Sequence, residues 1–205
     1  MDLIGWFTLG VVAAALLASW WYGRRSDQRR AAGARAWASS VGLTELPFEQ
    51  EGVPGDAKVR RLRTMPSFVG TLDGRKVSVL ATSTRPRFGD LWVLCTHAQR
   101  PPLFLGSIVG FSGANVFSNA APQGWTRAKA GGEVDEHFFV SVAEAGTEPA
   151  LSDDARAALI DANVHAWCFT VNPSGFTVLW FKQSNGQNTQ EALTQAARLL
   201  ERLLA

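Results

Sequence analysis

The chain has 205 residues, a formal net charge of +2 and two cysteines. Two cysteines are too few for a disulfide scaffold, which excludes the small, disulfide-stapled class of secreted proteins. Basic residues concentrate in one half, because residues 24–100 hold fourteen Lys and Arg against seven Asp and Glu. The densest basic run, residues 58–63, is short and has acidic neighbours, so no nucleic-acid partner is predicted.

The first informative element is a run of twenty-one uncharged residues over 3–23. As a helix this run would be about 31 Å long, close to the thickness of a bilayer's hydrocarbon core. The sequence therefore predicts a transmembrane helix over residues 1–23. Aromatic and basic residues are typical of the membrane interface, and those expected there are Trp6, Trp20, Trp21, Tyr22, Arg24, Arg25, Arg29 and Arg30.

The flanking charges predict an orientation. Only Asp2 precedes the run, whereas arginines crowd the other side, and positive charge stays on the inner side of a membrane. We therefore expect a single-pass protein of the inner cell membrane with a cytoplasmic C-terminal domain and membrane lipids as partners. A cleaved export signal is the alternative, but the acidic start, the long apolar core and the terminal Trp20 and Trp21 are not typical of one.

Small residues recur every fourth position within the run. Gly10, Ala14 and Ala18 would lie on one helix face and allow a second helix to approach closely. Gly and Ala are also common in helices that pair with nothing, so the pattern is a candidate for helix pairing and not a demonstration of it.

A basic helical segment is predicted over residues 24–43. Ala34, Trp37, Ala38 and Val41 have the spacing of one apolar helix face, and Gly42 is placed to end the helix. The segment would join the apolar run to a soluble domain over residues 44–205.

From about residue 44 to 143 the pattern changes to short extended runs broken by Gly, Pro and Asn. Residues 68–72 and 76–80 flank Asp73-Gly74, a dipeptide that favours a tight hairpin. Further strands are predicted over residues 91–96, 103–109 and 138–142, and residues 124–132 are expected to be loop.

The last sixty residues predict helix, hairpin, helix. Ser152 is placed to cap the first helix and Asn188 the second, and Asn172 begins the turn between two strands over 167–171 and 176–181. Because strands outnumber helices and do not alternate with them, the fold class is α+β with a mainly antiparallel sheet.

The chain resembles bacterial single-pass membrane-anchored domains of unknown function. The resemblance lies in Trp37 with Gly42-Leu43, in the hairpin motif over residues 68–77, and in the motif over residues 134–140 before a capped helix. It implies a fold and a membrane location, and it supplies no catalytic residues.

Three patterns are candidates for chemical sites. Ser112 in Gly110-Phe-Ser-Gly-Ala114 approximates a nucleophile elbow, but the helix that should follow it is missing. His137 has acidic neighbours, yet adjacent residues on a strand face opposite ways. The ligand types for zinc are present in Cys95, His97, His165 and Cys168, but their spacing is poor. No catalytic residue, metal site or cofactor is predicted.

Two functions follow, with a third kept for contrast. The first is a non-catalytic interaction or assembly module at the membrane, which docks a protein partner or self-associates. The second is a sensor or binding domain close to anionic lipid, motivated by the basic half of the chain. The third is an enzyme whose site cannot be read from the sequence.

Overall fold

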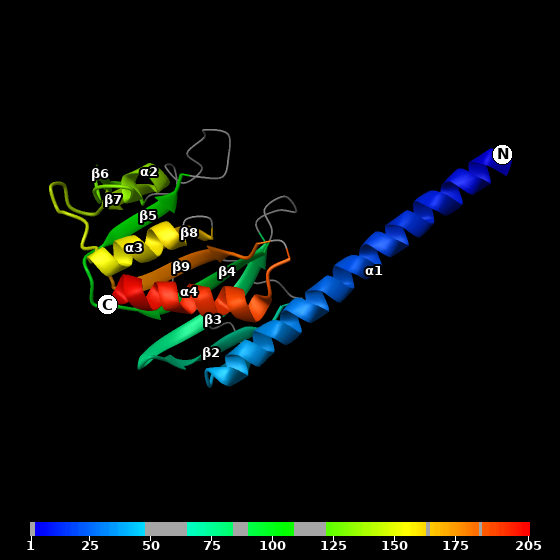
Figure 1. Ribbon diagram of the computed structural model, residues 1–205, viewed down its shortest axis with the longest axis horizontal. Coiled ribbons are helices and arrows are strands. Elements are labelled where there is room, and N and C mark those ends of the chain that lie inside the picture. Colours follow the sequence, from blue (N-terminus) through cyan, green and yellow to red (C-terminus); the bar gives the residue numbers. More distant parts are fainter. Residues whose placement is uncertain (1–2, 48–64, 84–89, 109–121, 163–164, 185) are drawn as a thin grey trace.

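The computed structural model describes residues 3–47, 65–83, 90–108, 122–162, 165–184 and 186–205. A long helix, α1 (Leu3–Ser40), leads into a sheet with three further helices. Figure 1 shows the N-terminal part of α1 projecting far from the rest of the molecule, whereas its C-terminal part lies against the sheet domain. The predicted basic segment over residues 24–43 is therefore the continuation of one helix.

Helix α1 ends where the sequence predicts. Gly42 has a φ of +74°, and the Leu43 amide donates to the Ala38 carbonyl at 2.8 Å. This left-handed residue satisfies the last carbonyl groups of the helix. The predicted apolar stripe is buried, with Ala34, Trp37 and Ala38 at most 2% exposed.

The transmembrane prediction is corrected by the structure. Among the described residues, none of the helices combines the length and the apolar character that a membrane crossing requires. A helix crossing the membrane over residues 1–23, and a single-pass topology with it, are therefore wrong.

The sheet is antiparallel throughout its described pairings, and its order is β1-β2-β3-β4-β9-β8-β5-β7-β6. The prediction of an α+β fold with a mainly antiparallel sheet is confirmed. Its strands are β1 (Thr44–Leu46), β2 (Ser67–Leu72), β3 (Arg75–Ser83), β4 (Asp90–His97), β5 (Leu103–Ser107), β6 (Thr126–Ala128), β7 (Phe138–Val142), β8 (Ala166–Val171) and β9 (Phe176–Lys182).

The hairpin between β2 and β3 follows from its turn residues. Asp73 and Gly74 have φ values of 49° and 76°, and Leu72 pairs directly with Arg75. Positive φ at both central residues makes a turn whose twist matches that of the strands. The predicted hairpin is confirmed.

Strands β4 and β5 follow one another in the chain but are not neighbours in the sheet. The β8–β9 hairpin lies between them, with β9 paired to β4 and β8 paired to β5. Asn172 builds the hairpin turn, since its Oδ1 accepts from the backbone amides of Ser174 and Phe176 at 3.1 and 2.8 Å. The C-terminal hairpin thus holds the two halves of the sheet together.

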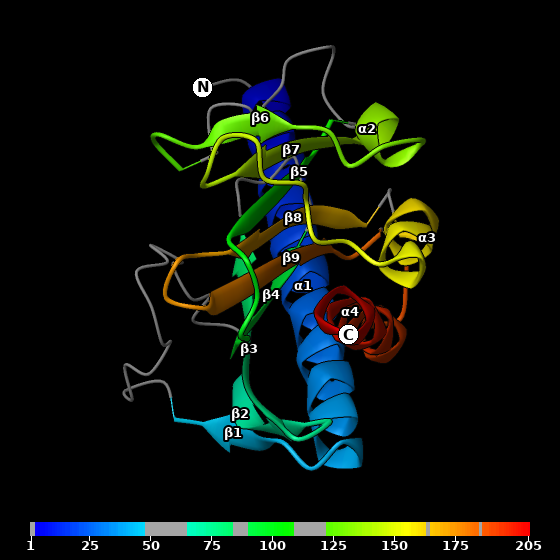
Figure 2. The same cartoon turned by 90° about the vertical axis from the view of Figure 1, so that its left-hand side faces the viewer.

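Helices α3 (Asp153–Asp161) and α4 (Thr189–Leu204) begin at the predicted caps. The Ser152 hydroxyl accepts from the Ala155 amide, and the Asn188 side chain accepts from the Gln190 amide. Each cap satisfies an amide that has no partner inside the helix. Figure 2 shows α3, α4 and the C-terminal part of α1 on the same face of the sheet.

Alternation along the strands divides the apolar side chains between two faces. Trp92 and Leu94 on β4 point into the main core beneath the helices. Val93 and Cys95 point to the opposite face, where they pack in a smaller cluster with Phe176 and Val178.

Two short elements differ from the sequence-based expectation. Strand β6 lies inside residues 124–132, which were predicted to be loop. Helix α2 (Val134–His137) is a single turn where an extended edge was expected. Both are too short to produce a recognisable hydrophobic period.

Candidate functional site

The projecting part of α1 is the most unusual surface of the described protein. Its large apolar side chains, from Leu9 to Tyr22, are 49–68% exposed. These side chains are Leu9, Val11, Val12, Leu16, Leu17, Trp20, Trp21 and Tyr22. Fully burying such a side chain is worth about 1.5–3 kcal/mol, so a continuous row of them indicates an interaction surface.

This apolar surface surrounds the helix instead of forming one stripe. Successive residues turn by about 100°, so Leu16, Leu17 and Tyr22 point to three different sides. All three are at least 66% exposed. A helix that is apolar all round needs an apolar environment on every side, which a single flat partner surface does not provide.

An aromatic and basic collar, defined here as Trp20, Trp21, Tyr22, Arg24 and Arg25, ends the apolar part. The Arg24 guanidinium lies over the Trp20 ring at 5.3 Å, and the Arg25 guanidinium lies over the Trp21 ring at 5.0 Å. The Trp21 and Tyr22 rings meet edge to face at 5.3 Å. These cation–π contacts fix the positive charges directly beside amphipathic rings.

The other residues predicted for the membrane interface also lie on α1. Arg29 is exposed and Arg30 is half-buried, one turn beyond the collar. Trp6 lies within α1, and its side chain is outside the described part of the protein. The structure does not test whether these residues lie at a membrane interface, so that role stays a prediction.

Gly10, Ala14 and Ala18 lie in the projecting part and are exposed. A Cβ atom added at Gly10 would meet nothing within 4 Å among the described residues. This face is therefore open, and helix pairing through it stays a prediction.

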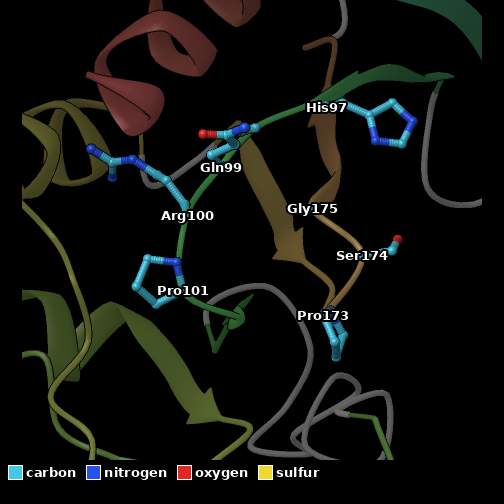
Figure 3. Close-up of a pocket in the computed structure, with 8 residues that line it drawn as sticks. His97, Gln99, Arg100, Pro101, Pro173, Ser174 and Gly175 are labelled. Carbon is cyan, nitrogen blue, oxygen red and sulfur yellow. The ribbon is translucent and has the colours of Figure 1, made fainter.

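A second feature is a cavity of about 710 Å³ beside the β8–β9 turn (Figure 3). It lies between the loop that follows β4 and the turn around Gly175. The residues that line it and are labelled in the figure are His97, Gln99, Arg100, Pro101, Pro173, Ser174 and Gly175.

The polar groups of this cavity do not converge. Figure 3 shows His97 and Arg100 pointing in opposite directions. Arg100 donates to the Leu203 carbonyl at 2.9 Å, and the Ser174 hydroxyl donates to Asn172 at 2.7 Å. Because these groups stabilise the helix end and the turn, they are structural side chains at a surface hollow.

The structure separates the four residues considered for zinc. Cys95 lies on β4 and Cys168 on β8, with β9 between these strands. Both thiols are buried, and desolvation raises the pKa of each to about 12, which disfavours the thiolate that binds metals. In the described part of the chain, no three His, Cys, Asp or Glu residues gather as a metal-binding group.

His137 and its acidic neighbours have structural surroundings. Asp135 accepts from the amides of Ala130 and Gly131 at 2.8 and 2.9 Å, which closes the turn before α2. His137 Nε2 lies 3.8 Å from Glu133, and its Nδ1 is buried without a described partner. Ser112, the candidate nucleophile, lies outside the described residues.

No protein-family model and no curated protein matches this chain. A crystal structure of the mycobacterial trehalose monomycolate transport factor A, TtfA, is similar over 87% of this chain and 93% of that chain, at 14% sequence identity and a TM-score of 0.49. At these values the likeness carries no argument about activity, substrate or partner.

Sequence reasoning missed a third feature, a hollow of about 330 Å³ between α3 and α4. Asp161 and Arg198 line it, although they are far apart in the sequence. Each looks like an ordinary charge on the outer side of a helix, so only the packing of the two helices reveals that they share a cavity.

Proposed function

We propose that this protein is a non-catalytic interaction module that associates with an anionic lipid surface on the cytoplasmic side. The observation that carries the proposal is the exposed apolar part of α1, from Leu9 to Tyr22, together with its aromatic and basic collar. The proposal concerns contact with lipid and requires no helix that crosses the bilayer.

Lipid suits this surface better than a flat protein partner for two reasons. Exposed apolar side chains can pack at the boundary between headgroups and acyl chains, and headgroups can meet the charges where the apolar part ends. Trp and Tyr rings beside arginines match the chemistry of the headgroup layer. Arg24, Arg25, Arg29 and Arg30 each contribute about 1 kcal/mol near an anionic surface.

The titratable groups whose pKa values are shifted lie on three different elements of the described domain. The shifted pKa values have structural causes: the Glu45 hydrogen bond raises the pKa of Arg35, and burial raises those of Cys95 and Cys168. Shifted groups that converge on a pocket would instead favour an enzyme. The sheet domain is then the part available to partners once α1 holds it at the surface.

Self-association through α1 is the competing function, because Gly10, Ala14 and Ala18 leave one helix face open. Parallel pairing would bring the collars of two copies together, and like charges repel. This electrostatic cost favours lipid over a second copy.

The test is vesicle co-sedimentation of the full-length protein. We compare neutral phosphatidylcholine vesicles with vesicles in which about a third of the lipid is phosphatidylglycerol. Replacing Arg24, Arg25, Arg29 and Arg30 by Gln should lower binding to anionic vesicles at least roughly tenfold, and salt should weaken wild-type binding.

The matched control replaces the exposed Arg127 and Lys129 by Gln, because these charges lie at the β6 edge far from the collar. This control should bind as the wild type does. Equal binding to both vesicle types without salt dependence would contradict the lipid proposal. A dimer in vesicle-free solution that Gly10→Leu dissociates would favour self-association.

A further inference from the structure

The hollow between α3 and α4 has an apolar floor. Ala158 on α3, Leu199 on α4 and Phe181 on β9 line it, and each is at most 5% exposed. Figures 1 and 2 show the two helices side by side on the sheet. The volume, about 330 Å³, is at the small end of the range for small-molecule sites.

The rim of the hollow carries opposite charges on opposite helices. Asp161 lies at the end of α3, whereas Arg198 and Arg202 lie one turn apart on α4. Within the described residues, the side chains of Asp161 and Arg198 make no hydrogen bond or ion pair. Arg202 approaches Asp154 only at 3.8 Å, a long contact between exposed groups. Charges of both signs therefore line one cavity without neutralising each other across it.

One wall of the hollow is held in place by His165. Its ring stacks on the Phe181 ring at 5.5 Å with an interplanar angle of 18°. His165 Nδ1 also lies 3.2 Å from the Lys182 carbonyl and 3.4 Å from the Ser184 hydroxyl. These contacts fix the ring, so the wall needs little rearrangement to receive a ligand.

We propose that this hollow binds a small zwitterion, namely a free α-amino acid with an apolar side chain. The carboxylate would face Arg198 and Arg202, whose planar guanidinium groups bind carboxylates through two parallel hydrogen bonds. The ammonium group would face Asp161 on the other helix. The apolar side chain would rest against Ala158, Leu199 and the His165 ring, which covers Phe181. A purely anionic ligand would leave the Asp161 carboxylate without a positive partner. A purely cationic ligand would leave both arginines without a negative partner.

The experiment is isothermal titration of the full-length protein with L-leucine and L-phenylalanine. Saturable binding of at least one is expected below about 10 mM. Two analogues of the amino acid that binds are then compared with it, and each analogue lacks one charge. The α-carboxamide has no carboxylate, and the carboxylic acid without the α-amino group has no ammonium group. Each should bind roughly tenfold more weakly than the amino acid or not at all.

Variants assign the two charges to their protein partners. Asp161→Asn and Arg198→Gln should each weaken amino-acid binding about tenfold, and both sites are exposed enough for the fold to be kept. Asp153→Asn and Arg127→Gln are matched controls outside the hollow and should change nothing. Binding by neither amino acid, equal binding of an analogue that lacks one charge, or unchanged affinity in both variants would overturn the proposal.

Discussion

The indole of Trp92 donates a hydrogen bond to Gln183 Oε1 at 3.0 Å inside the core. Both residues are at most 5% exposed. The Gln183 amide donates in turn to the Thr189 hydroxyl at 3.1 Å and to the Gln187 carbonyl at 2.8 Å. One side chain therefore links the central strand β4 to the start of α4.

Removing this link should destabilise the fold. Gln183→Leu leaves the buried indole N–H without a partner, and an unsatisfied buried donor costs about 1–3 kcal/mol. The free energy of unfolding, measured in urea, should fall by that amount. Gln195→Leu is the matched control, because this exposed side chain only accepts from Gln187. A loss no larger in Gln183→Leu than in the control would contradict the role given to the link.

A pair of glycine variants separates backbone strain from crowding. Gly74 and Gly175 have φ values of 76° and 79°, so Ala at either position costs about 1–2 kcal/mol in strain. A Cβ at Gly175 would also lie 2.7 Å from the Ala98 carbonyl oxygen, whereas nothing lies near Gly74. Gly175→Ala should therefore lower the free energy of unfolding clearly more than Gly74→Ala does. If urea unfolding shows that the two variants lose the same free energy of unfolding, the turn at Gly175 moves away from the Ala98 carbonyl without cost, which contradicts this prediction.

The buried thiols predict a pH dependence of stability. Burial raises the pKa of Cys95 and Cys168 from 9.0 to about 12 in the folded state. Between these values the unfolded chain loses the thiol protons while the folded chain keeps them, so rising pH favours unfolding. The contribution of the two protonated thiols to the free energy of unfolding is complete below pH 9 and should decrease from there toward pH 12.

Urea unfolding at several pH values above 8 measures this decrease. The control is the double variant Cys95→Ala and Cys168→Ala, whose free energy of unfolding should have a smaller slope against pH. Iodoacetamide should label the folded wild type slowly and the unfolded protein rapidly. Rapid labelling of both thiols in the folded protein would contradict their burial.

The end of α4 should depend on Arg100. Its guanidinium donates to the carbonyls of Leu203 and Ala150, at 2.9 and 3.3 Å. Carbonyls at a helix end lack partners within the helix, so Arg100→Met should lower the free energy of unfolding by about 1–2 kcal/mol. Arg202→Met, which removes only a 3.8 Å contact with Asp154, should have little effect. In hydrogen exchange, the backbone amides at the end of α4 should be less protected in Arg100→Met than in the wild type, which locates the loss of stability there.

Local patterns predicted the local elements of this fold. Asp73-Gly74 predicted the β2–β3 turn because few other residues adopt two consecutive positive φ values. Ser152 and Asn188 predicted the two helix starts because their side chains supply the missing acceptors. The alternation of Trp92 with Val93 matches the two faces of the sheet.

Properties that depend on distant segments were out of reach. The order of β4, β9, β8 and β5 depends on which strand edges meet, and a strand's sequence does not name its neighbours. Asp161 and Arg198 could not be connected, because their shared cavity exists only when α3 and α4 pack on the sheet.

The insertion of β8 and β9 between β4 and β5 has a consequence for biosynthesis. When the ribosome has made β5, β4 still lacks its partner β9, and β5 still lacks both of its partners, β7 and β8. Only the last fifth of the polypeptide, which holds β8 and β9, supplies the strands that join them. An incomplete nascent chain therefore exposes unpaired strand edges, which favour misassociation. Premature termination anywhere before residue 182 should therefore produce an aggregation-prone fragment and not a smaller stable domain.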